Sequence, residues 1–285
     1  MGKAYISRLD ATRIYKRMCE QTSVPMLRGV LLRGEKPGLY DSKLGGVPYW
    51  DPSMPYPVGF DGQKLMLLIQ INFEQLPENV RLCPHVGMLQ VFIGLDDLYG
   101  CSLMPPEKET KKNWCLIYQP HVKQDVSEAD VLKLDIPTSL TVDDGPVTGM
   151  LKIRFSEPVM EPISWADCRA EGIMRKIAHD LYIEMDEDFD ILDFMDCLPE
   201  DVKDTWCRTS EGLKLFGYPM FTQFDPRDEN YPQYDRLLLQ IDSDYKRTYK
   251  NYVLWGDLGI ANFFINRYAL ARWDLSKVWY NWDCG

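Results

Sequence analysis

Short, nearly continuous apolar runs recur along this chain, separated by segments rich in glycine and proline. The strongest runs lie at residues 65–72, 88–95, 235–242 and 259–265. Apolar residues at almost every position predict strands that are buried on both faces of a sheet. Weaker patterns predict four more strands, at residues 25–33, 113–118, 150–155 and 277–282.

Helical patterns are fewer. Ser7, followed three residues later by Asp10, predicts the start of a helix over residues 7–21. Ser164 with Asp167 predicts a second helix start in the same way. The proline-rich and glycine-rich segments at 34–62 and 121–148 are expected to be irregular, because proline lacks an N–H donor and fixes φ.

The chain repeats itself. KLGGVPYW at 43–50 matches KLFGYPMF at 214–221, LLIQIN at 67–72 matches LLLQID at 237–242, and GMLQVFI at 87–93 matches GIANFFI at 259–265. The offsets between the paired motifs are nearly equal, which predicts an internal duplication. We expect an α+β fold in which duplicated antiparallel β-sheet units share one core with peripheral helices. The expected single domain, 1–285, divides into repeat 1 (about 25–120), a helical and acidic connection (about 121–205) and repeat 2 (about 206–285).

Negative charge is concentrated in one segment. The net charge is −11, and residues 184–204 hold ten acidic residues and one lysine. Apolar residues at three- and four-residue spacing in this segment predict an amphipathic helix, which Pro199 divides if it starts a new turn. A solvated helix face is the simplest interpretation. The alternative is a docking helix for a basic protein partner, formed by Asp186, Glu187, Asp188 and Asp190.

Composition narrows the class of protein further. No basic stripe is present for nucleic-acid phosphates, and no apolar run is long enough to cross a bilayer. The N-terminus lacks the apolar core of a signal peptide, so a cytoplasmic protein is expected. The eight cysteines are scattered without a C-x-x-C pair, which predicts free thiols and neither disulfides nor a metal site. No cofactor motif is present, and the sequence does not specify an oligomeric state.

Three carboxylates are the best candidates for chemistry. Asp242 and Asp244 leave the end of a predicted strand on one side, and Asp257 lies in the turn that leads to the next strand. Together they could bind a hard cation or act as an acid–base pair. The corresponding positions of the first repeat hold Asn72 and His85. The alternative is that these aspartates only stabilise turns.

Aromatic residues surround the prolines in both repeats. They either fold back over the sheet or line a binding groove with rigid side chains. The candidate binding aromatics are Tyr49, Trp50, Tyr56, Tyr218, Phe221, Phe224, Tyr231, Tyr234 and Trp255.

The motifs KLGGVPYW, LLLQIDSD, WGDLG, NFFI and SKVWYNWDC resemble the YwqG-like family of bacterial proteins. The resemblance covers nearly the whole chain and is weakest over residues 121–205. It implies an internally duplicated α+β fold, a bacterial cytoplasmic origin and an immunity or interaction role, and it carries over no catalytic residues.

Two hypotheses follow, and the sequence does not decide between enzyme and non-enzyme. The first is a non-catalytic binding or protein-interaction module. The second is a carboxylate-site enzyme, metal-dependent in one version, centred on Asp242, Asp244 and Asp257. The absence of a nucleophile elbow and of a phosphate-binding loop favours the first.

Overall fold

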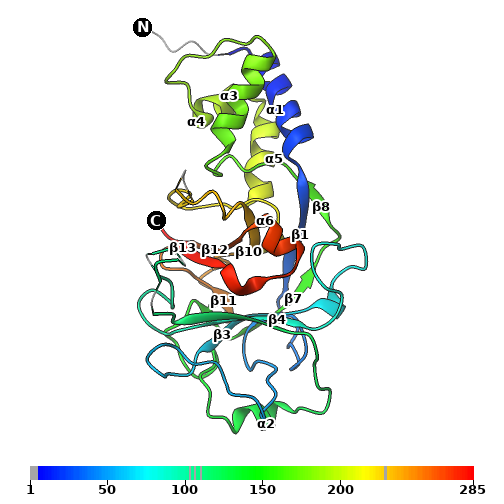
Figure 1. The fold of residues 1–285 in the computed structure, drawn as a ribbon, viewed down its shortest axis with the longest axis vertical. Helices are drawn as coiled ribbons and strands as arrows, with labels where there is room; N and C mark the ends of the chain where they lie inside the picture. The colour runs from blue at the N-terminus through cyan, green and yellow to red at the C-terminus, as the bar shows by residue number, and fades with distance from the viewer. Residues whose placement is uncertain (1–5, 103, 106, 110, 228–229) are drawn as a thin grey trace.

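A computed structural model of the chain describes residues 6–102, 104–105, 107–109, 111–227 and 230–285. It contains one large antiparallel sheet of eleven strands that curls into a half-barrel (Figure 1). The first ten strands in spatial order are β13 (Trp279–Asp283), β12 (Ile260–Ile265), β10 (Arg236–Asp242), β9 (Lys214–Phe216), β1 (Val24–Leu32), β7 (Met150–Phe155), β2 (Lys43–Gly45), β3 (Met66–Asn72), β4 (Met88–Ile93) and β5 (Trp114–Gln119). The eleventh, β8 (Val159–Glu161), pairs with β1, and a separate pair joins β6 (Val147–Thr148) to β11 (Tyr252–Val253).

The two outer groups of strands, β2-β3-β4-β5 and β9-β10-β12-β13, have the same order and the same irregularity. The register shifts between Leu67 and Ile69 where β3 faces β4, and between Leu237 and Leu239 where β10 faces β12. The central strands pair across the two groups. β1, which precedes β2 in the chain, pairs with β9, whereas β7 pairs with β2. Each group therefore depends on the other half of the chain.

A buried polar ladder crosses the loop-covered face of each group. Its members are Lys43, Gln70 and Gln90 in one group and Lys214, Gln240 and Asn262 in the other. Gln70 accepts a hydrogen bond from Tyr49 N, and Gln240 accepts one from Met220 N, both at 2.8 Å. The ladder side chains form hydrogen bonds with backbone groups of the loops that cover them, because buried polar groups need hydrogen-bond partners.

The opposite, concave face of the curled sheet holds the main apolar core. Strands of both groups contribute to it, for example Ile71 and Ile93 in one and Leu239 and Phe263 in the other. Trp114, at the start of β5, packs edge-on against Phe263, with ring centroids 6.0 Å apart. The two edges of the sheet are therefore drawn together around a single core.

The helices lie mainly at one end of the molecule (Figure 1). α1 (Arg8–Thr22) leads directly into β1 and gathers there with α3 (Ala170–Asp180), α4 (Ile191–Cys197) and α5 (Glu200–Ser210). They bury a core of their own that includes Ile14, Met174, Phe194 and Trp206. α2 (Glu128–Leu132) lies at the opposite end, and α6 (Arg267–Ala271) follows β12, with short 3-10 turns at Phe73–Gln75 and Leu275–Lys277.

The α+β class, the eight expected strands and the helix at 7–21 are confirmed, each element within two residues at both ends. The short elements were missed. The segment 34–62 contains β2, whose three residues are extended because they pair with β3 and β7. The segment 121–148 contains α2, which Ser127 caps. The expected helix start at Ser164 and Asp167 is wrong, because α3 begins at Ala170 and Asp167 binds arginines instead.

All eight cysteines are free thiols. Across the described part of the chain, none of the helices combines the length and the apolar composition needed to span a membrane.

Candidate functional site

The three predicted carboxylates bind separate partners. Asp242 accepts a hydrogen bond from Gly212 N at 2.8 Å, and burial raises the pKa of Asp242. Asp244 forms a 2.8 Å ion pair with Arg33, and Asp257 is exposed in the turn before β12. Within the described residues, these three do not bring ligand atoms within 4.8 Å of one another. An acid–base role for them stays a prediction.

The two counterpart residues in the first half also act separately. The Asn72 side chain accepts a hydrogen bond from Glu74 N and donates one to Tyr40 O, both at 3.0 Å. His85 is exposed, and its Nε2 lies 3.4 Å from Nη1 of Arg81. Asn72 therefore holds local backbone structure, and His85 has no carboxylate beside it in the described structure.

Most of the candidate aromatics cover the sheet. Those that are buried are Tyr49, Trp50, Tyr218, Phe221, Tyr234 and Trp255. Tyr56 and Tyr231 are half-buried, and Phe224 is exposed. The loops therefore fold back over the sheet, although Tyr231 and Tyr234 also line a cavity described below.

The acidic segment is not one helix, so the predicted docking helix is corrected to a loop followed by two short helices. Residues 183–190 are non-helical, and α4 begins after Asp190. The Asp190 side chain accepts hydrogen bonds from Leu192 N and Asp193 N, both at 2.8 Å, which is the capping role that aspartate prefers to a helix interior. The predicted docking residues Asp186, Glu187, Asp188 and Asp190 thus precede α4, and a break at Pro199 separates α4 from α5.

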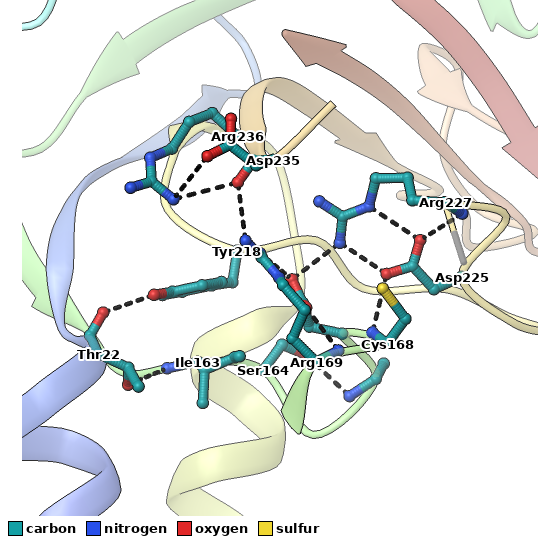
Figure 2. Close-up of polar contacts among 12 residues, drawn as sticks. Thr22, Ile163, Ser164, Cys168, Arg169, Tyr218, Asp225, Arg227, Asp235 and Arg236 are labelled. Carbon is teal, nitrogen blue, oxygen red and sulfur yellow. Dashed lines mark hydrogen bonds and ion pairs between the residues drawn. The ribbon is translucent and has the colours of Figure 1, made fainter. Parts of the chain in front are cut away.

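A network of arginines and carboxylates joins the start of α3 to the loop before β10 (Figure 2). Two Asp-x-Arg motifs supply it, and they have the same local geometry. Asp167 accepts from Arg169 N at 3.1 Å and from its Nε at 2.7 Å. Asp225 accepts from Arg227 N at 3.0 Å and from its Nε at 2.9 Å. Each arginine is therefore held in a fixed orientation by the aspartate two residues before it.

Arg227 links the two motifs. Its Nη2 donates to Asp225 at 2.6 Å and to Asp167 at 2.8 Å, and only 3% of the side chain is exposed. Burial alone would raise the pKa of Asp167, but Arg227 and Arg169 outweigh it and lower this pKa to about 2. Asp167 is therefore ionised throughout the neutral range, and its ion pairs hold the loop against the helical layer.

A cavity of about 580 Å³ opens beside this network. Its lining includes Arg169, Arg227, Arg267, Tyr231, Tyr234 and Asp235. We call it the arginine cavity. Arg169 donates to Asp235 O at 3.0 Å, and the Nε of Arg267 donates to the Asp235 carboxylate. Arg169 remains 33% exposed and Arg267 51% exposed, so part of each side chain is accessible to solvent.

The network also contains the one group of three His, Cys, Asp or Glu residues whose ligand atoms lie within 4.8 Å in the described residues, namely Asp167, Cys168 and Asp225. Both carboxylates are bound by guanidinium groups. Burial and the two neighbouring carboxylates raise the pKa of the Cys168 thiol to about 12. A metal needs a thiolate and accessible carboxylate oxygens, so this donor set favours ion pairing over metal binding.

Residues 42–284 match the sequence model of a family described as a domain of unknown function, DUF1963. The chain belongs to this family. A comparison with curated proteins found no match. The DUF1963 region includes β2 to β13 and every residue of the arginine cavity, whereas α1 and β1 precede it.

A second cavity of the DUF1963 region, of about 550 Å³, lies at the corresponding place in the first group of strands. The register pairs Met66 with Ile93 and Arg236 with Ile265, so Leu65 corresponds to Asp235 and Leu95 to Arg267. By the same count, the corresponding residues for Tyr231 and Tyr234 are Asp61 and Lys64, which line the second cavity. The fold therefore makes a cavity in both groups, and the side chains give each its own chemistry.

The sequence interpretation missed the arginines of this site. The signal that could have found them is the repeated Asp-x-Arg pattern at 167–169 and 225–227, in which a turn-forming aspartate sits beside its own counter-ion. The pattern is short, and the two copies meet only in the folded chain.

Proposed function

We propose that the protein is a non-catalytic binding module whose ligand carries an anionic group and occupies the arginine cavity. The observation that supports this is the preorganisation of the guanidinium groups. Each arginine donates its Nε hydrogen to an aspartate, namely Asp167, Asp225 or Asp235, and this holds the side chain in one orientation. Little side-chain entropy is therefore lost when a ligand binds. Arginine in a fixed orientation is well suited to carboxylates and phosphates.

The alternative of a carboxylate-site enzyme has less support. Asp242, Asp244 and Asp257 each have a different environment, and the two that are partly buried are already bound to protein groups. A catalytic carboxylate pair needs both members within reach of one substrate.

Three probes that share a phenyl ring test the anion requirement: phenylacetate, phenyl phosphate and neutral phenylacetamide. We expect at least one of the two anions to bind in the arginine cavity and the amide not to bind, as measured by titration calorimetry at constant ionic strength. Arg267→Gln is expected to weaken that binding about tenfold or more, because a hydrogen bond to a charged group contributes about 1.5–3 kcal/mol.

Arg272→Gln is the matched control, since Arg272 is exposed just after α6 and does not line the cavity. The Arg272→Gln variant should bind the anions with the same affinity as the unmodified protein. Equal binding of the amide and both anions would disprove the proposal.

We also propose that the two groups of strands arose by internal duplication with exchange of the central strand. The matched ladders, the register shifts at Leu67 and Leu237, and the pairing of β1 and β7 across the two groups support this. A YwqG-like ancestry would agree with such a history.

A second candidate function is interaction with a basic protein partner through the acidic segment. One feature favours it: Tyr182, at the end of α3, is 96% exposed beside this segment and has a positive φ of 57°. An exposed aromatic ring among acidic residues could stack on arginine or lysine side chains. Salt screens the field of such a surface over about 8 Å at physiological ionic strength.

The expected result is a partner that binds faster at low salt than at moderate salt. Changing Glu187 and Asp188 to Gln and Asn should slow association and leave the unfolding free energy nearly unchanged, because exposed charges contribute little to stability. A pull-down at two salt concentrations, with unmodified and neutralised protein, measures this. Recovery of the same proteins in all four samples would contradict it.

A further inference from the structure

We propose that the arginine cavity selects a carboxylate attached to an apolar or aromatic body over a phosphate. This inference rests on the proposed function and specifies its ligand class. It is supported by the charge balance of the cavity, by the geometry of Arg267, and by the contrast with the corresponding cavity in the first group of strands.

The charge balance favours a single negative charge. Each of the three arginines that line the cavity is paired with a buried or nearly buried aspartate: Arg169 with Asp167, Arg227 with Asp225, and Arg267 with Asp235. Arg236 also lies 3.8 Å from Asp235, so among the described residues the cluster holds four arginines and three aspartates, an excess of one positive charge before a ligand enters. A phosphate monoester carries about −1.5 to −2 charges at pH 7, and Asp235, which lines the cavity, would repel it. A carboxylate brings one negative charge, which balances the single positive excess of the described cluster.

Arg267 offers the geometry that a carboxylate needs. Its Nε is bound to Asp235, which holds the guanidinium plane in place. Among the described residues, no hydrogen-bond partner is found for the edge formed by Nη1 and Nη2, and half of the side chain is exposed. Two parallel N–H groups on such an edge match the two oxygens of a carboxylate. α6, which begins at Arg267, has only five residues and adds no helix-terminal anion site.

The cavity walls suit an apolar body. Tyr231 and Tyr234 both pack edge-on against Trp279, with ring centroids 5.2 and 5.3 Å apart. The Tyr234 hydroxyl donates to Glu107 at 2.6 Å, which fixes its ring. Rigid aromatic walls bind apolar groups with little loss of side-chain entropy.

The second cavity, in the first group of strands, shows that these features do not follow from the fold alone. Asp61 corresponds to Tyr231, Lys64 to Tyr234 and Leu95 to Arg267. The guanidinium edge and the aromatic walls are thus present in one cavity and absent from the other within the described residues. This contrast is expected of a specialised site and not of a general consequence of strand geometry.

The test compares phenylacetate with phenyl phosphate by titration calorimetry at pH 7.5 and constant ionic strength. We expect phenylacetate to bind about tenfold more tightly. Arg267→Gln should weaken phenylacetate binding about tenfold or more, whereas it should change phenyl phosphate binding much less. Tyr231→Ala should weaken phenylacetate binding several-fold, because it removes one aromatic wall. Arg272→Gln is the control that should change neither.

Tighter binding of phenyl phosphate, lost in Arg267→Gln, would overturn the carboxylate inference and leave the proposed function intact. Phenylacetate binding that survives both Arg267→Gln and Tyr231→Ala would place the ligand elsewhere and overturn the inference. No binding of either anion would overturn both. Urea unfolding of each variant at pH 7.5 distinguishes a loss of binding from a loss of folding. If Arg267→Gln unfolds at a lower urea concentration than the unmodified protein, Arg267→Lys takes its place, because lysine keeps the charge but cannot bind a carboxylate through two parallel N–H groups.

Discussion

Replacing Lys214 by methionine is expected to lower the unfolding free energy by about 3–5 kcal/mol, because it leaves a buried carboxylate without its cation. Lys214 Nζ lies 2.6 Å from Glu161 Oε1, and neither side chain is exposed. The other oxygen of Glu161 accepts from Tyr218 N at 2.8 Å. Burial raises the pKa of Glu161 and lowers that of Lys214, which disfavours the charged form of each group. The charge of each partner offsets this effect on the other. Urea unfolding at pH 7 measures the loss.

Lys43→Met is the matched control. Lys43 has the same place in the first polar ladder, but Nζ donates to two carbonyls, Gly38 O at 2.9 Å and Leu39 O at 3.1 Å, and burial lowers the pKa of Lys43 to about 8. Its removal leaves no buried carboxylate, so we expect a smaller loss, about 1–3 kcal/mol for unsatisfied acceptors. An equal loss in the two variants would show that Glu161 does not depend on its ion pair.

The loss in Lys214→Met should also depend on pH. Glu161 without a cation has a folded-state pKa still further above its unfolded value. Such a group stabilises the folded state below the unfolded pKa and loses that contribution as pH rises. The variant should therefore be destabilised less at pH 4.5 than at pH 7. The double variant Glu161→Gln with Lys214→Met should recover part of the loss at pH 7.

The sheet could be predicted from the sequence because its long strands carry their own signal. The runs that became β3, β4, β10 and β12 are apolar at almost every position, and this alone indicates burial on both faces. β2 and β9 carry no such signal. Each has three residues, and each is extended because strands from distant parts of the chain pair with it on both sides.

The site could be predicted only in part. Tyr231 and Tyr234 were among the candidate aromatics, since aromatic residues beside proline are visible in the sequence. The arginines were not, because Arg169, Arg227 and Arg267 lie far apart in the chain and meet through tertiary structure. The acidic helix failed for a local reason. The spacing of apolar residues favoured a helix that continues through Asp190. Asp190 instead caps α4, so the helix begins only after it.

Replacing Asp167 by asparagine is expected to cost about 3–5 kcal/mol of unfolding free energy at pH 7. Its carboxylate binds Arg169 through both oxygens and also accepts from Arg227, and it is fully buried. The substitution leaves two guanidinium groups without their shared counter-ion at the junction between α3 and the loop before β10. Asp204→Asn is the control, since Asp204 and Arg208 form an exposed pair at 4.0 Å, which is expected to contribute less than about 1 kcal/mol.

The pH dependence distinguishes the charge of Asp167 from its shape. Its folded-state pKa is about 2, below the ordinary value of 3.8, so its ionisation stabilises the folded state above pH 3.8 and loses that effect as pH falls towards 2. The difference corresponds to about 2 kcal/mol. The gap in stability between the unmodified protein and Asp167→Asn should therefore be constant from pH 7 to pH 5 and narrow by about this amount between pH 4 and pH 2. Because the asparagine keeps the shape but cannot ionise, a gap that stays constant down to pH 2 would mean that packing, and not the two arginine ion pairs, holds this junction together.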